Sequence, residues 1–183
     1  ILFYSLDHSD GFDPHSGWDV AILRIFRNGQ FLTVAEQRGS FMLRPLMSDE
    51  GEVVWRDNNG VVRLSSGRRL GNGDAGLSPG ISDRGGRVAW VEDGSLWLTS
   101  AADQWLPIRL VNPTDNELVG SIETDQRVGV GFAEGSSGRS AFAVFVGTNA
   151  NGQATLFVAQ IPEGTTNPEQ VAVVPLATAG EAI

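Results

Sequence analysis

A chain of 183 residues, 41% hydrophobic and 19% charged, has an ordinary globular composition and is long enough for one domain with a core. Its net charge of −9 and its thirteen scattered basic residues argue against nucleic acid and anionic membrane surfaces, since both need a clustered basic face. The lack of cysteine excludes disulfides and cysteine-bound metals, and the sequence has no 18-residue apolar run for insertion into a membrane.

Four hairpins are predicted along the chain, at residues 20–34, 52–66, 87–100 and 141–161. Each has two runs rich in β-branched and aromatic residues, with an Asn-Gly or Asp-Gly pair near the tip. Such pairs supply the positive φ angles of a type I′ turn. The turn glycines are Gly29, Gly60, Gly94 and Gly152.

The two middle hairpins follow a repeated turn, in PLMSDEGEVVW (45–55) and PGISDRGGRVAW (79–90). The shared positions are Ser48 with Ser82, Asp49 with Asp83, Gly51 with Gly85, and Trp55 with Trp90. We expect the Asp carboxylate to accept hydrogen bonds from later amides and the Gly to take the left-handed conformation. These features favour a structural role for the turn over a catalytic one.

The stretch ISDRGGRVAWVEDGSLWLTS, and more loosely MSDEGEVVWRDNNGVVRLSS, resembles the repeats of TolB-type β-propellers. The likeness covers residues 45–100, with Glu50 and Arg84 where that family often has Asp, and with a slightly short period. The resemblance implies one four-stranded blade per repeat. It concerns the fold and hardly the activity.

Several strand-like runs, such as VAWV and AFAVFV, are apolar on both faces, which is typical of sheets covered on both sides. We therefore predict one all-β, antiparallel, repeat-built domain over 1–183, propeller-like with about four blades. The expected blades are 1–38, 39–75, 76–118 and 119–177. Four blades are few for closure, which leaves a small closed ring, an open fragment or closure between chains, and a β-sandwich is the alternative fold.

The first run, ILFYSL, is apolar and has no expected partner within its own hairpin, and EQVAVVPLATAGEAI ends the chain with another strand-like run. They could pair with each other to close a ring, or complete the sheet edge of a neighbouring subunit. In the second case the interaction residues would be Ile1, Leu2, Phe3 and Tyr4.

Residues 5–19, SLDHSDGFDPHSGWD, gather four acidic side chains and both histidines of the chain. The acidic residues are Asp7, Asp10, Asp13 and Asp19. Their oxygens are the ligands that calcium prefers, and Gly11 would allow a sharp turn among them. The spacing departs from the EF-hand pattern, and His8 and His15 define no transition-metal geometry. A solvated, turn-rich connector is therefore the alternative.

Catalytic signals are weak. No Gly-x-Ser-x-Gly elbow is present, and carboxylate pairs such as Glu50 with Glu52 are common neighbours on strands. The five tryptophans are expected in the core, unless several share one exposed surface as a sugar platform.

These observations favour a non-enzymatic structural or interaction subunit that self-assembles through terminal strands or sheet edges, with calcium in its acidic loops. One alternative is a TolB-like envelope propeller that binds a protein partner on its blade-top loops, and another is an accessory domain of a secreted hydrolase. A chain without Cys fits a cytosolic or an exported protein. The start at Ile1 without Met indicates a processed product or a piece of something longer, which favours export to the cell envelope or the exterior. The expected partner is another protein or further copies of the chain.

Chelation tests the calcium prediction. A ligand that binds only the folded state stabilises it, so EDTA should lower the Tm of the protein. The double variant Asp10→Asn/Asp13→Asn should abolish this effect of EDTA on the Tm, whereas Asp49→Asn should leave the effect intact. A Tm that EDTA does not change would contradict calcium binding.

Overall fold

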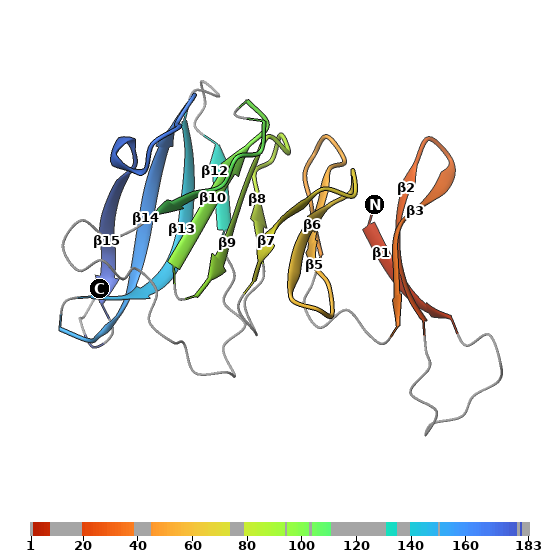
Figure 1. Cartoon of the computed structure of the whole chain (residues 1–183), viewed down its shortest axis with the longest axis horizontal. Coiled ribbons are helices and arrows are strands. Elements are labelled where there is room, and N and C mark those ends of the chain that lie inside the picture. Colours follow the sequence, from red (N-terminus) through yellow and green to blue (C-terminus); the bar gives the residue numbers. More distant parts are fainter. Residues whose placement is uncertain are drawn as a thin grey trace.

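The computed structural model consists of four antiparallel sheets that follow one another in a row (Figure 1). The structure describes residues 2–7, 20–38, 45–73, 79–93, 95–102, 104–110, 131–134, 140–149, 151–178 and 180. Within these residues the chain is all-β, as predicted, apart from one 3-10 turn, η1 (Pro168–Gln170). A search of the same residues finds no helix with the length and apolar character to cross a membrane.

Each sheet is built from strands that are consecutive in the chain. Sheet 1 comprises β1 (Leu2–Asp7), β2 (Val20–Arg27) and β3 (Gln30–Arg38). Sheet 2 comprises β4 (Leu46–Met47), β5 (Val53–Arg56), β6 (Val61–Leu64) and β7 (Arg69–Asn72). Sheet 3 comprises β8 (Gly80–Ile81), β9 (Arg87–Glu92), β10 (Ser95–Ser100) and β11 (Ile108–Leu110). Sheet 4 comprises β12 (Gly131–Glu134), β13 (Ser140–Thr148), β14 (Ala154–Pro162) and β15 (Ala172–Thr178).

The core consists of three apolar layers, one between each pair of neighbouring sheets. Successive side chains of a strand point to opposite faces, so a strand with apolar neighbours on both sides needs apolar residues throughout. On β9, Val88 and Trp90 pack toward sheet 2, while Ala89 and Val91 pack toward sheet 4. Sheets 2 and 3 are therefore covered on both faces, which explains why their strands do not alternate with polar residues.

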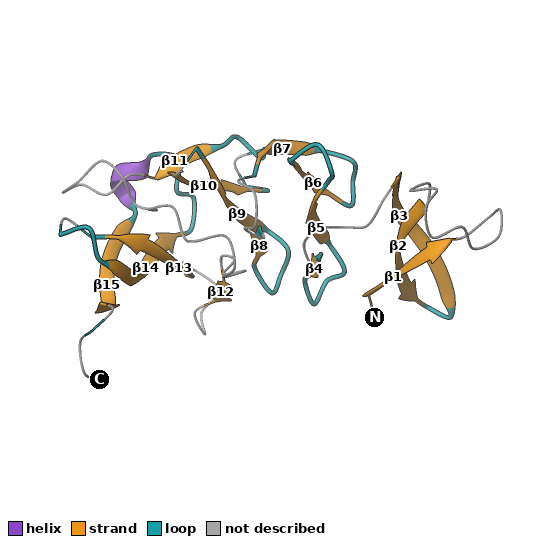
Figure 2. Cartoon of the chain, turned by 90° about the horizontal axis from the view of Figure 1, so that it is seen from below, coloured by secondary structure: helices purple, strands orange, loops and turns teal. Residues whose placement is uncertain are grey.

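The sheets spread like a fan when viewed from below (Figure 2). The short first strands of sheets 2, 3 and 4 are neighbours, because β8 contacts both β4 and β12. Sheets 1 and 4 lie at opposite ends of the row (Figure 1), so the four sheets form no closed ring within the chain. Four stacked layers also differ from the two layers of a β-sandwich.

The expectation that the first run lacks a partner within its own hairpin is wrong. β1 pairs with β2, with Phe3 opposite Arg24, and β15 pairs with β14, with Val174 opposite Val158. The two terminal strands therefore belong to different sheets and do not meet, because each finds its hydrogen-bonding partner in the adjacent hairpin.

All four predicted hairpins are present, but their turns differ from the single type expected. Asn28 and Gly29 have φ values of 53° and 77°, as a type I′ turn requires. In the β5–β6 turn only Gly60 has a positive φ, because the Asp57 Oδ1 atom accepts the amides of Asn59 and Val61 (both 2.9 Å). This geometry is that of a longer loop that ends in a left-handed glycine.

The repeated turn is held by its serine rather than by its aspartate, which corrects the expectation from sequence. The buried Ser48 hydroxyl accepts the amide of Glu52, and the buried Ser82 hydroxyl accepts the amide of Arg87 (both 3.1 Å). The two turns also bond to each other, since the Asp49 amide donates to the Asp83 carbonyl at 2.7 Å. The repeat therefore fixes how sheets 2 and 3 stack at this end.

Substituting Gly85 tests this stacking of turns. Gly85 has a φ of +70°, and a Cβ atom there would lie 2.8 Å from the Ser48 hydroxyl oxygen and 2.9 Å from the Glu52 Cβ. We expect Gly85→Ala to reduce the free energy of unfolding by about 2–4 kcal/mol in a denaturant titration.

Two glycines serve as controls for this variant. A Cβ atom meets open space at Gly86 and at Gly67, and only Gly67 has a positive φ, of +82°. We expect Gly86→Ala to change stability by less than about 0.5 kcal/mol and Gly67→Ala to cost about 1 kcal/mol. Equal reductions in the free energy of unfolding for Gly85→Ala and Gly67→Ala would show that the contact between the two turns contributes nothing to stability.

Candidate functional site

A groove runs between the turns at the upper end of the sheets in Figure 1, and we call it the turn-face groove. Its volume is about 520 Å³. Its walls come from turns of sheets 1, 2 and 3, and include Arg27, Glu50, Glu52, Ser65, Arg84 and Trp105. The groove exists because every second turn of the antiparallel array emerges at this end.

Two further hollows adjoin the groove through shared walls. A hollow of about 420 Å³ between sheets 1 and 2 shares Arg27, Glu50 and Gly51 with it. A smaller one, of about 190 Å³ between sheets 3 and 4, shares Arg84, Gly86 and Ala101 with it and has Leu98, Ile108 and Ile161 among its walls. The three hollows together extend along the turns from sheet 1 to sheet 4.

The groove carries charges of both signs. Arg27 and Arg84 supply guanidinium groups, and Glu50 and Glu52 supply carboxylates. Glu52 is held in place, because the Ser65 hydroxyl donates to its Oε1 atom at 2.6 Å. The Ser65 hydroxyl oxygen in turn accepts a hydrogen bond from the Val53 amide at 3.1 Å. Such alternating charge suits the mixed side chains and amides of a polypeptide better than it suits a uniformly anionic ligand.

Trp105 forms a wall of the groove in a strained backbone conformation. Its φ is 62°, and that of Gln104 is 55°, in a region that bulky side chains rarely adopt. The conformation is held because the Trp105 amide donates to the Ser100 carbonyl at 2.7 Å and Arg68 donates to the Gln104 carbonyl at 3.2 Å. The indole packs against the layer between sheets 2 and 3, so its position is fixed. No glycine or Asn-Gly pair signals this turn in the sequence.

Half of the site residues expected from the sequence lie outside the described residues. These are Ile1, Asp10, Asp13 and Asp19, together with both histidines. Asp7 ends β1, where its backbone pairs with Val20. Over the residues that the structure does describe, no three metal-binding side chains come together, so calcium binding stays a prediction.

The residues expected to mediate subunit contact occupy an edge strand. Leu2, Phe3 and Tyr4 lie in β1, opposite Ile25, Arg24 and Leu23 of β2. Exchange of β1 between subunits would therefore first have to break its pairing with β2.

The tryptophans of the described residues pack as core, as expected. Trp55 and Trp90 are buried, and the Trp90 ring stacks on Trp97 with centroids 6.3 Å apart. Trp97 and Trp105 are half-buried against the same layer, between sheets 2 and 3. Trp105 borders the turn-face groove and Trp55 borders a hollow at the opposite end of sheet 2, so these two rings do not form one shared platform.

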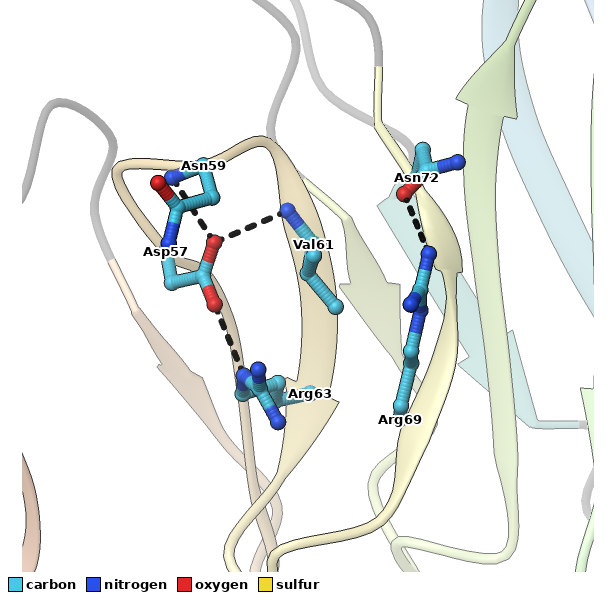
Figure 3. A network of polar contacts seen from close by, with 6 residues as sticks. All are labelled: Asp57, Asn59, Val61, Arg63, Arg69 and Asn72. Atoms are coloured by element: carbon cyan, nitrogen blue, oxygen red, sulfur yellow. Dashed lines mark hydrogen bonds and ion pairs between the residues drawn. The ribbon is translucent and has the colours of Figure 1, made fainter.

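A polar network at the opposite end of sheet 2 is structural (Figure 3). It borders a hollow of about 410 Å³ lined by Glu36, Trp55, Asp57 and Arg63. The Asp57 Oδ2 atom accepts the Arg63 guanidinium at 2.7 Å, while its Oδ1 atom holds the two amides of the turn. Burial by itself would raise the pKa of Asp57, but the hydrogen bonds from Arg63 and the amides outweigh it and lower the pKa.

Comparison with known proteins assigns no family to the chain. No family model matches the chain, and no curated protein matches it. Among solved structures, the crystal structure of the eukaryotic initiation factor is similar with a TM-score of 0.41 and 8% sequence identity. That similarity covers 92% of this chain and 43% of the other, so the chain spans less than half of that structure's length.

The pH dependence of stability tests the role of Asp57. Asp57→Ala should reduce the free energy of unfolding by about 2 kcal/mol at pH 7, because it removes a charged acceptor of three hydrogen bonds. Asp57→Asn should reduce the free energy of unfolding by less, because the side-chain oxygen of Asn can still accept hydrogen bonds from the turn amides. Asn149 does this in the β13–β14 turn, where its Oδ1 atom accepts the amides of Asn151 and Gln153.

The sign of the effect follows from the lowered pKa. A carboxyl group whose pKa is lower in the folded state stabilises it above the unfolded pKa, and this contribution is lost as the pH falls through the folded value. The difference in stability between wild type and Asp57→Asn should be constant from pH 7 to about pH 5 and shrink below about pH 4. Denaturant titrations that show a constant difference down to about pH 2 would contradict this role.

Proposed function

We propose that the chain is a non-enzymatic interaction module, exported to the cell envelope or exterior, which binds a protein partner in the turn-face groove. The observation that carries this proposal is the groove itself, which crosses the turns of three sheets with mixed charges and a fixed aromatic wall. An acidic chain without cysteine, whose repeats resemble those of TolB-type propellers, fits such a location.

The finer fold that accompanies this function is an open, propeller-like arc with the four sheets as blades. Face-to-face stacking, the neighbouring first strands of sheets 2 to 4 and the repeated turn of residues 45–100 all support it. Propellers commonly use the turns at one end of their blades as a binding surface, because those turns converge from several blades.

The partner we propose is an extended polypeptide segment. A chain lying across the turns could offer carboxylates to Arg27 and Arg84 and basic groups to Glu50 and Glu52. Trp105 presents a rigid ring, which costs little conformational entropy on binding. The smaller hollow, which shares walls with the groove, has Leu98 and Ile161 among its own walls, and an apolar side chain of the ligand could be buried there.

Filling the groove tests this proposal. Gly86 borders both the groove and the smaller hollow, and a side chain there would point into open space. Peptides should be selected from a displayed random library on the immobilised wild-type protein, and their Kd measured by fluorescence anisotropy. We expect Gly86→Phe to weaken the selected peptides by about tenfold or more, because it occupies their site.

The control places the same bulky side chain far from the groove. Ala154 is exposed at the start of β14, at the opposite end of the strands, so Ala154→Phe should leave peptide affinity unchanged. Both variants should keep the wild-type Tm. A failure to select any peptide, or equal binding to the two variants, would disprove the groove as a docking site.

A further inference from the structure

Sheet 1 has one strand fewer than each of the other sheets. In sheets 2, 3 and 4 the third strand pairs with a fourth, which is β7, β11 or β15. In sheet 1 the order is β1-β2-β3, so no strand of the described part of the chain pairs with the far edge of β3. An edge of this kind presents backbone amides and carbonyls to which another extended chain can bond.

The exposure of β3 also distinguishes it from the third strands of the other sheets. Leu32 is 47% exposed, and none of residues 30–36 is buried. By contrast, three of the four residues of β6 and four of the six residues of β10 are buried. Even in sheet 4, which also ends the row, β14 has four buried residues. The far edge of β3 is therefore accessible from solvent.

The fourth strands of sheets 2 and 3 each contribute an apolar side chain to the layer beside them. Leu70 of β7 is buried between sheets 2 and 3, and Leu110 of β11 is buried between sheets 3 and 4. Beside β3, between sheets 1 and 2, lies the hollow of about 410 Å³, whose walls include Ala35, Glu36, Trp55 and Arg63. A residue paired with Ala35 would share its face of the sheet and reach this hollow.

The charges of the hollow indicate which side chain it would accept. Its charged walls are Glu36, Asp57 and Arg63, and the Arg63 guanidinium already bonds to the Asp57 Oδ2 atom at 2.7 Å. The Glu36 carboxylate is thus the charge that a bound chain has to match. The whole chain has a net charge of −9, so it attracts a basic segment, whereas a second copy of β3 would bring a like charge at Glu36.

We propose that the far edge of β3 binds an extended segment of another protein, which adds a fourth strand to sheet 1 and places a basic side chain in the hollow beside Glu36. In this mode of recognition the backbone hydrogen bonds supply affinity and alternate side chains supply specificity. The surface is separate from the turn-face groove, which has no residue of β3 among its walls.

A bulge in β3 limits the length of the added strand. Val34 is an extra residue, because Thr33 pairs with Arg24 and Ala35 pairs with Leu23. The bulge leaves a run of four residues on either side, at 30–33 and 35–38. Since β7 has four residues and β11 has three, runs of this length are sufficient for a fourth strand in this protein.

Binding of a defined strand-forming peptide tests this inference. The probe is a fluorescein-labelled peptide with two valines and a central arginine on one face and threonines on the other. Fluorescence anisotropy should show saturable binding to the wild-type protein with a Kd below about 1 mM. Glu36→Arg should weaken this binding by about fivefold or more, and should strengthen binding of the same peptide with a central glutamate by a similar factor.

Two controls separate the edge from the rest of the surface. Glu169→Arg makes the same change of charge at an exposed residue of η1, next to sheet 4, and should leave the affinity within about twofold of wild type. Gly86→Phe, which fills the turn-face groove, should also leave the affinity unchanged. The circular dichroism and Tm of each variant report its fold.

Methylation of the peptide backbone distinguishes strand pairing from attraction by charge alone. Alternate amides of a strand point to opposite sides, so only one set of them can bond to β3. N-methylation of one alternate set should abolish binding, and N-methylation of the other set should preserve it. Hydrogen exchange in β3 should slow when the unmethylated peptide is bound.

Every other outcome overturns the inference. These outcomes are no binding up to about 1 mM, tolerance of both methylated sets, equal losses in Glu36→Arg and Glu169→Arg, or loss of binding in Gly86→Phe. Wild-type multimers that the peptide disperses, seen by light scattering during gel filtration, would show that a second copy occupies the edge instead. The library selection on the groove does not depend on this edge, so failure of one proposal does not decide the other.

Discussion

Apolar packing between consecutive sheets is the interaction on which the rest of the structure depends. Burying a large aliphatic or aromatic side chain contributes about 1.5–3 kcal/mol, and sheets 2 and 3 do so on both faces. A strand such as β9 can then be apolar along its whole length without exposing a surface prone to aggregation.

Polar contacts fix the sheets relative to one another but do not drive their association. The Glu92 carboxylate joins sheets 2 and 3, because its Oε2 atom accepts both the Trp90 indole N–H and the Asn72 amide at 3.0 Å. Gly71 allows this close approach, since a Cβ atom there would lie 2.7 Å from the Trp90 ring. At the other end of the strands, the bond between the repeated turns has the same effect. The turn-face groove is therefore bordered by parts of the chain that cannot easily shift.

The turn-face groove differs in chemistry from the apolar layers of the core. The groove combines opposite charges with a fixed tryptophan, which favours a specific and reversible peptide ligand.

Features that depend on neighbouring residues could be predicted from the amino-acid sequence alone. The hairpins at Gly29, Gly60 and Gly152, the repeated turn and the doubly apolar strands were predictable, because φ preferences and side-chain alternation act over a few positions. The geometry of the Asp57 turn and the serine bonds of the repeat required the positions of side chains. The pairing of β1 with β2, the left-handed Trp105 and the groove were decided only by tertiary structure. Each depends on residues distant in sequence, whose relative positions follow from how whole sheets pack.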